Sequence, residues 1–190
     1  MTTRIDRVYL ARHGRTALNA EDRLRGLSNP PLDAVGLAEV RRLGKVLAEL
    51  HPAKVISSPL QRAVSTAEAI AEAAEVESLV DQRLNDRDYG PHTGQRRTDV
   101  IARYGSVDAA PGVESLDALT RRARTAFGQL VDEATSGPLV LVSHDAFNRA
   151  LLGTIDPALA NAPQRTACWN QLSFVDGTWR VDAYDQKPSE

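Results

Sequence analysis

Two arginines and two histidines have the types and positions needed to bind and transfer a phosphoryl group. Arg12 and His13 directly follow the apolar run Val8–Ala11, and His144 follows a second apolar run. A guanidinium donates parallel N–H groups to phosphate oxygens, and an imidazole is a nucleophile once a backbone acceptor fixes its other nitrogen. Arg62 is predicted in the first turn of a helix, where free backbone N–H groups also favour an anion. The pattern indicates phosphoryl transfer to an imidazole, with the cations stabilising the equatorial oxygens.

Each of these residues taken alone has an ordinary structural explanation. A short Arg-His-Gly sequence recurs by chance, Arg62 could be a solvated helix residue, and His144 could be a core histidine. Gly14 allows the backbone to approach a ligand closely, but a turn would also explain it. The combination favours a phosphate site, because the residues occur in order and each follows a predicted strand.

Strands alternate with helices along the chain, and this alternation determines where those residues lie. Strands are predicted at 5–11, 55–56 and 139–142, helices at 36–50, from 58 to about 74, at 114–134 and 145–153, and a hairpin at 168–175 and 179–184. Residues 15–35 and 81–112 have no period, apart from a short helix near 96–104. The pattern predicts the α/β class, as a three-layer α/β/α sandwich with a mostly parallel central sheet. Ligands of such sheets bind beyond the carboxyl ends of the strands.

Two helices have details that a structure can test. In the helix from 58, Ser58 is predicted as the N-cap, Pro59 as the first helical residue and Gln61 as the partner that completes a capping box. In the helix at 114–134, apolar residues at helical spacing predict one buried face. That face comprises Leu116, Leu119, Ala123, Phe127, Leu130 and Val131.

The composition is that of an ordinary globular protein. The 190 residues carry a net charge of −2, which argues against binding to nucleic acid or anionic lipid, and they suffice for a single domain over 1–190. Cys168 is the only cysteine, so no intrachain disulfide or thiolate metal site is expected. No signal peptide or membrane span is evident, and a cytoplasmic protein is expected. The sequence allows a homodimer but does not determine the oligomeric state.

Three segments resemble the signatures of the histidine phosphatase superfamily, which includes cofactor-dependent phosphoglycerate mutases and fructose-2,6-bisphosphatase. They are LARHGRTALN, SSPLQRAVSTA and VSHDAFNRALL, with PLDAVG and PGVES in the expected order between them. The resemblance covers about residues 5–153 and implies a phosphoglycerate mutase-like fold. It implies that His13 becomes phosphorylated in a pocket formed with Arg12, Arg62 and His144. It also implies that Asn19 contacts the phosphate. No cofactor or metal is expected, because the arginines and histidines supply the positive charge.

The proton donor departs from the commonest family pattern. Many relatives have Glu in a Leu-x-Glu segment, where this chain has Asp86, whose shorter side chain requires the backbone to lie closer to the leaving oxygen. The acid phosphatases use an Asp directly after the second histidine, and Asp145 occupies that position. We expect Asp86 to be the donor, with a pKa raised by partial desolvation. The alternatives are a loop carboxylate paired with Arg83 or Arg87 for Asp86, and a helix N-cap for Asp145.

Three further residues are weaker candidates for contacts with the substrate. Arg23 and Arg25 lie in the long loop after His13 and could reach a second anionic group, although either one alone is expected to face solvent. His92 occupies a position that is usually aromatic in relatives, and an exposed loop histidine is expected there.

The predicted activity is metal-independent hydrolysis of a small phosphorylated metabolite through a phosphohistidine. A mutase must protect its phosphohistidine from water under a cover. Residues 81–112 and the short C-terminal part leave little chain for one, so a phosphatase is favoured. The alternatives are a phosphoglycerate mutase-type phosphotransferase, a phosphohistidine-protein phosphatase and a non-catalytic phosphate-binding module.

Overall fold

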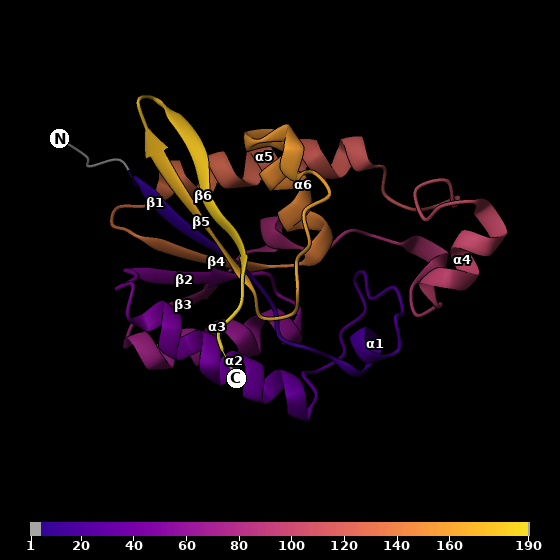
Figure 1. Cartoon of the computed structure of the whole chain (residues 1–190), viewed down its shortest axis with the longest axis horizontal. Coiled ribbons are helices and arrows are strands. Elements are labelled where there is room, and N and C mark those ends of the chain that lie inside the picture. Colours follow the sequence, from indigo (N-terminus) through magenta and orange to yellow (C-terminus); the bar gives the residue numbers. More distant parts are fainter. Residues whose placement is uncertain (1–4, 190) are drawn as a thin grey trace.

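The computed structural model describes residues 5–189 and contains a six-stranded sheet of order β3-β2-β4-β1-β5-β6 (Figure 1). The first four strands along the chain are mutually parallel: β1 (Arg7–Arg12), β2 (Lys54–Ser57), β3 (Ser78–Val80) and β4 (Leu139–Ser143). The antiparallel strand β5 (Trp169–Val175) extends the sheet beside β1, and β6 (Thr178–Gln186) forms a hairpin with it. The predicted sheet and hairpin are therefore confirmed.

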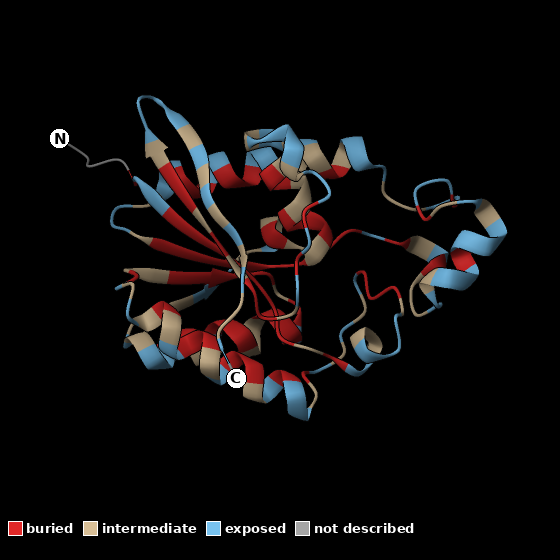
Figure 2. Cartoon of the chain, viewed as in Figure 1, coloured by how far each residue is buried: buried red, intermediate tan, exposed pale blue. Residues whose placement is uncertain are grey.

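Helices cover both faces of the sheet. α2 (Ala34–Ala48) and α3 (Gln61–Ala74) lie on one face, and α5 (Leu116–Glu133) and α6 (Asp145–Ile155) lie on the other (Figure 1). Each face has its own apolar cluster, and β1 and β4 contribute alternate side chains to both. Figure 2 shows the buried residues along these strands and on the inner faces of the helices. This is the predicted three-layer α/β/α sandwich.

The two segments without a period form a lobe beyond the carboxyl ends of the strands (Figure 1). We define the lobe as residues 17–28 and 85–113, which include α1 (Ala17–Ala20) and α4 (Arg97–Tyr104). Three backbone hydrogen bonds join its parts: Leu24 N to Gln95 O at 2.9 Å, Gly94 N to Leu24 O at 2.7 Å and Arg97 N to Asp22 O at 3.0 Å. A small apolar cluster, separate from the two main clusters, packs inside it: Leu24, Tyr89, Val100, Val107 and Ala110, with Tyr104 and Val113 partly buried against them.

Some local expectations are wrong. Helix α3 begins at Gln61 with Leu60 as its N-cap, so Ser58 neither caps the helix nor forms a capping box. Leu116 lies in the first turn of α5, beyond the apolar cluster, and is 49% exposed, whereas the rest of its predicted face is buried. Strand β3 was not predicted, because a strand of three residues is too short to show a period in the sequence. Its residues show no alternation of burial in the structure either. Within residues 5–189, no helix is both long and apolar enough to cross a membrane.

Candidate active site

The parallel pairing of β1 with β4 brings the two histidines together. Arg12 is in register with Ser143, so the residues that follow, His13 and His144, leave the sheet side by side. The amide of His13 donates to Ser143 O at 3.2 Å, and the two imidazole centroids are 5.1 Å apart. Both side chains are fully buried.

The hydrogen bonds of His13 determine which ring nitrogen can react. Nδ1 lies 2.7 Å from the carbonyl oxygen of Gly14, which can only accept, so Nδ1 carries the proton. Arg62 Nε donates to His13 Nε2 at 3.3 Å, consistent with a lone pair on Nε2. Burial, followed by the charge of Arg62 and that of His144 when it is protonated, holds the pKa of His13 well below 6.5. His13 is therefore a neutral imidazole whose Nε2 lone pair faces the guanidinium of Arg62.

Gly14 has a packing role that differs from the predicted approach to a ligand. A Cβ atom at this position would lie 2.6 Å from Val40 Cγ1 and 2.9 Å from Gly36 O, both on α2. Its amide donates to Thr66 Oγ1 at 3.1 Å. Gly14 thus lets helix α2 pack closely against the turn, and its carbonyl orients His13.

The guanidinium of Arg62 connects the nucleophile to a carboxylate. Beyond its contact with His13, Nη2 donates to Asp86 Oδ2 at 3.0 Å. The lobe holds the same group in place, because Nη1 donates to Ser28 O and Nη2 to Gly26 O, both at 2.8 Å. Arg62 is fully buried, so four contacts from three segments fix its orientation.

Two more buried arginines lie beside this group. Arg12 Nη1 donates to Gln164 O and Arg25 Nη1 donates to Arg23 O, whereas the Nε atoms of Arg12 and Arg25 have no hydrogen-bond partner within residues 5–189. Burial, followed by the charge of Arg12, lowers the pKa of Arg25 to about 10, so it remains charged at neutral pH. Arg25 is buried, so the expectation that it faces solvent is wrong. Its charge helps to lower the pKa of both histidines.

Asp86 is the buried carboxylate of the site. Oδ2 contacts Arg62 and lies 3.6 Å from His144 Nδ1, and Oδ1 accepts from the amide of Arg87 at 2.8 Å. Burial opposes its ionisation, but the positive charges of His144 when protonated and of Arg62 and Arg25, with the Arg87 amide, hold the pKa of Asp86 below its usual range. The expected rise of this pKa is therefore wrong, because the positive charges and the Arg87 amide outweigh desolvation.

His144 is neutral, and its imidazole contacts Ser58, which the sequence predicted to be a helix N-cap. Burial, together with the nearby arginines, lowers its pKa to about 3 despite the opposing effect of Asp86. Its Nε2 lies 2.7 Å from Ser58 Oγ, and its Nδ1 has no hydrogen-bond partner among the described residues. The signal for this role was the position of Ser58 directly after a strand, at the same edge of the sheet as the histidines.

Several other candidates lie outside this cluster. Asn19 completes a capping box of α1, whose N-cap is Thr16: Asn19 Oδ1 accepts from the amide of Thr16 at 3.0 Å and from Thr16 Oγ1 at 2.8 Å. Arg23 pairs with Glu21 at 2.6 Å and joins the two parts of the lobe through Gly94 O. Asp145 begins α6 and pairs with Arg149 at 3.0 Å.

His92 is not the exposed loop histidine that the sequence predicted. It is buried in the lobe, where Nε2 lies 3.0 Å from Pro111 O and the ring packs edge-on against Tyr104, with centroids 5.2 Å apart. The short helical turn Gly90–His92 directs the side chain inward, so His92 packs the lobe in the way an aromatic residue would.

The site is also more enclosed than the sequence indicated. His13, Arg62 and His144 have no exposed surface, and the lobe carbonyls of Gly26 and Ser28 contact Arg62 directly. The prediction that little chain was available for a cover is therefore wrong. Residues 17–28 and 85–113 form one, through a pairing between distant segments that has no local sequence signal.

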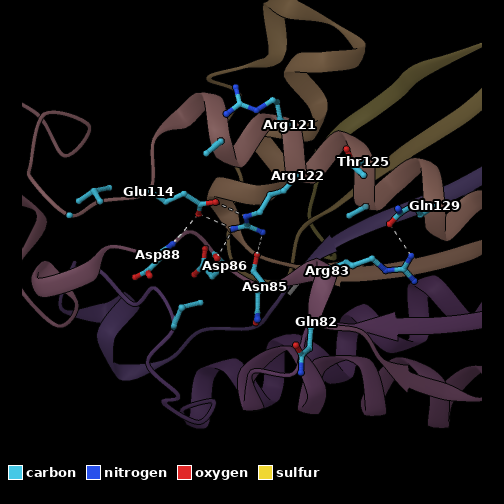
Figure 3. Close-up of a pocket in the computed structure, with 15 residues that line it drawn as sticks. Gln82, Arg83, Asn85, Asp86, Asp88, Glu114, Arg121, Arg122, Thr125 and Gln129 are labelled. Atoms are coloured by element: carbon cyan, nitrogen blue, oxygen red, sulfur yellow. Dashed lines mark hydrogen bonds and ion pairs between the residues drawn. The ribbon is translucent and has the colours of Figure 1, made fainter.

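A cleft of about 1070 Å³ reaches Asp86 from the side of α5. Figure 3 shows Asn85, Asp86 and Asp88 in the lining of this cleft, with Glu114 and Arg122 hydrogen-bonded to the same segment. The sequence did not identify Glu114 or Arg122 as residues of the site. The available signal was the PGVES segment, which contains Glu114.

Comparison with known proteins identifies relatives over nearly the whole chain. The family model of the histidine phosphatase superfamily (branch 1) matches residues 8–187. The Bacillus subtilis protein described as uncharacterized phosphatase PhoE is 29% identical over 94% of this chain and 93% of its own. The probable phosphoglycerate mutase GpmB of Salmonella paratyphi C is 33% identical over 93% of this chain and 89% of its own.

Solved structures agree with this assignment. The mycobacterial glucosyl-3-phosphoglycerate phosphatase in complex with VO3 superimposes with a TM-score of 0.88 at 26% identity, covering 96% of this chain and 100% of that one. The match of the family model over residues 8–187, the GpmB relative and this shared fold lead to one assignment. The chain belongs to branch 1 of the histidine phosphatase superfamily.

Proposed function

We propose that this protein is a metal-independent phosphatase that hydrolyses small phosphomonoesters through a phosphohistidine at His13. The observation that carries the proposal is the fixed tautomer of His13, with Nδ1 bound to Gly14 O and Nε2 directed at Arg62. An imidazole held in this way presents its lone pair where the cations bind the phosphoryl oxygens. Relatives named as phosphatases support the same reaction class.

The reaction proceeds in two steps. First, the Nε2 lone pair of His13 attacks phosphorus, the ester P–O bond breaks, and the leaving oxygen takes a proton from the Asp86 carboxyl group. Second, a water oxygen attacks phosphorus while the Asp86 carboxylate takes a proton from that water. The P–N bond then breaks, its electrons return to His13, and inorganic phosphate leaves. Arg12, Arg25 and Arg62 stabilise the transferring group in both steps.

Substrate binding prepares Asp86 to act as the acid. The positive charges around Asp86 keep its pKa low. A phosphate dianion bound to the same arginines offsets their charge and leaves burial as the dominant influence, so the pKa rises. A monoanionic ester brings the required proton with it.

A second function, phosphoglycerate mutase-type transfer, is supported by two specific observations. The phosphoglycerate mutase 2 of Gloeobacter violaceus is 35% identical over 78% of this chain and 75% of its own. The buried nucleophile also suits an enzyme that must keep water from a phosphohistidine. We favour hydrolysis, and release of free phosphate separates the two activities.

The test is a phosphate-release screen with wild type and His13→Ala, without added metal. The substrates are p-nitrophenyl phosphate, sugar phosphates, phosphoglycerates, nucleotides and phosphopeptides. We expect turnover by wild type, a loss of at least about 10⁴-fold in His13→Ala, and an acid-labile adduct on His13 after incubation with a labelled ester.

Three outcomes would replace the proposal. Interconversion of phosphoglycerates with almost no free phosphate would indicate a mutase. Selective turnover of phosphohistidine peptides would indicate a protein phosphatase. Equal background turnover by both proteins, with phosphate binding retained, would indicate a binding module.

A further inference from the structure

Arg122 of α5 contacts the backbone that carries the proposed proton donor. Its Nη1 donates to Asn85 O at 2.9 Å, and its Nη2 donates to Asp86 O at 2.7 Å. The same guanidinium pairs with both carboxylate oxygens of Glu114, through Nε at 2.6 Å and Nη2 at 3.0 Å (Figure 3). Four hydrogen bonds therefore fix Arg122 between Glu114 and the backbone of the donor.

Glu114 holds the other end of the same segment. Its Oε2 accepts from the amide of Asp88 at 3.2 Å, and its own amide donates to Asp88 O at 2.8 Å. Arg87 Nε donates to the carbonyl of Glu114 at 2.9 Å. Residues 85–88 lie outside helices and strands, so these contacts replace the regular hydrogen bonding that positions the two histidines.

We propose that Glu114 and Arg122 are positioning residues that hold residues 85–88 so that the Asp86 carboxyl group reaches the leaving oxygen. The proposal rests on the proposed function, in which Asp86 is the acid. An aspartate has one methylene fewer than a glutamate, so the position of its backbone directly limits its reach. Displacement of a catalytic group by about 1 Å can cost about 10²-fold in rate.

The test compares two substrates that differ in their need for an acid. The alkoxide leaving group of β-glycerol phosphate must be protonated, whereas p-nitrophenolate leaves without a proton. Measured as kcat/KM, which covers the steps up to release of the alcohol, Arg122→Gln should lose about 10-fold or more with β-glycerol phosphate. With p-nitrophenyl phosphate it should lose less than about 3-fold.

Three further variants sharpen the test. Arg124→Gln is the matched control, because Arg124 lies on the same helix, is exposed and does not line the cleft; it should leave the turnover of both substrates unchanged. Arg122→Lys keeps the charge but cannot join two carbonyls and a carboxylate, so it should show the same selective loss. In the Asp86→Asn background, Arg122→Gln should cause little additional loss, because both changes remove the same contribution.

Arg122 also lies over the Phe147 ring, 5.9 Å from its centroid, so a merely structural role is the competing explanation. Equal losses on both substrates, additive losses with Asp86→Asn, or unfolding of both Arg122 variants would assign that role and overturn the proposal. Absence of phosphate release by wild type from either ester would instead refute the proposed function. No selective loss in Asp86→Asn would refute Asp86 as the donor, and the positioning role with it.

Discussion

The proposed phosphate pocket and the segment of the proposed proton donor are held in place in different ways. His13 and His144 follow adjacent parallel strands, whose ladder hydrogen bonds fix their backbones. Asp86 lies in an irregular segment that is held by the side chains of Glu114 and Arg122. Regular hydrogen bonding between strands thus positions the two histidines, whereas side-chain contacts between segments far apart in the sequence position Asp86.

This difference separates two contributions to the proposed reaction. The pocket acts on the transferring phosphoryl group, which every substrate shares. The donor acts on the leaving group, which differs between substrates. Damage to the pocket should therefore lower activity toward all substrates alike, whereas damage to the donor segment should depend on the leaving group.

Apart from loss of the nucleophile itself, loss of the Arg62 guanidinium should lower activity the most. Arg62→Lys cannot contact His13, Asp86 and the lobe carbonyls at once, so we expect kcat/KM to fall by about 10³-fold. β-Glycerol phosphate and p-nitrophenyl phosphate should both show a large loss. A loss confined to one of them would break the division between pocket and donor.

Removal of the proposed acid should have a large but selective effect. Asp86→Asn keeps the shape of the side chain and removes its exchangeable proton, so kcat/KM for β-glycerol phosphate should fall by about 10²-fold. For p-nitrophenyl phosphate it should fall by less than about 3-fold, and a burst of p-nitrophenol should precede slow steady-state turnover. Comparable losses with both esters would contradict a role in protonating the leaving group.

The buried histidines should make stability depend on pH. In the folded state the pKa values of both histidines lie below the unfolded value of 6.5, and that of His144 is about 3. Below pH 6.5 the unfolded chain therefore binds more protons than the folded chain. The free energy of unfolding should therefore decrease as pH falls from 7.5 to 5, by at most about 1.4 kcal/mol per pH unit for each histidine.

Urea unfolding in phosphate-free buffer would measure this dependence. Above pH 5 the dependence reports the histidines and not Asp86. The pKa of Asp86 is lowered in the folded state, so its contribution to stability is lost only as the pH falls toward and below the unfolded value near 3.8. His51→Gln, at an exposed position, should leave the slope unchanged. His144→Gln should reduce the slope by about half, and an unchanged slope in that variant would contradict the burial of a neutral His144.

Asp145 should be the least sensitive position. Asp145 lies in the first turn of α6, where a carboxylate stabilises a helix by about 0.3–1 kcal/mol. It also pairs with Arg149. Asp145→Asn should lower stability by that amount and change kcat/KM by less than about 2-fold for either ester. A selective loss with β-glycerol phosphate would transfer the donor role from Asp86 to Asp145.

The sequence alone predicted where β1, β2 and β4 end and that helices cover both faces of the sheet, but not the order of the strands. Apolar runs followed directly by Arg12-His13 and by His144 were sufficient, because parallel strands bring their carboxyl ends to one edge. The same local logic failed at Ser58, where a capping pattern competed with a contact to His144. It also failed at Leu116, because helical periodicity does not say where the core ends.

Only the tertiary structure decided the electrostatics and the enclosure of the site. The pKa of Asp86 depends on groups that come from the end of β4, from α3 and from the lobe, so no local pattern could give even the direction of its shift. The burial of Arg25 and the positioning contacts of Arg122 likewise join segments far apart in the chain. Regular backbone structure has a local period and can be predicted, whereas interactions between side chains on irregular segments depend on how the whole chain packs.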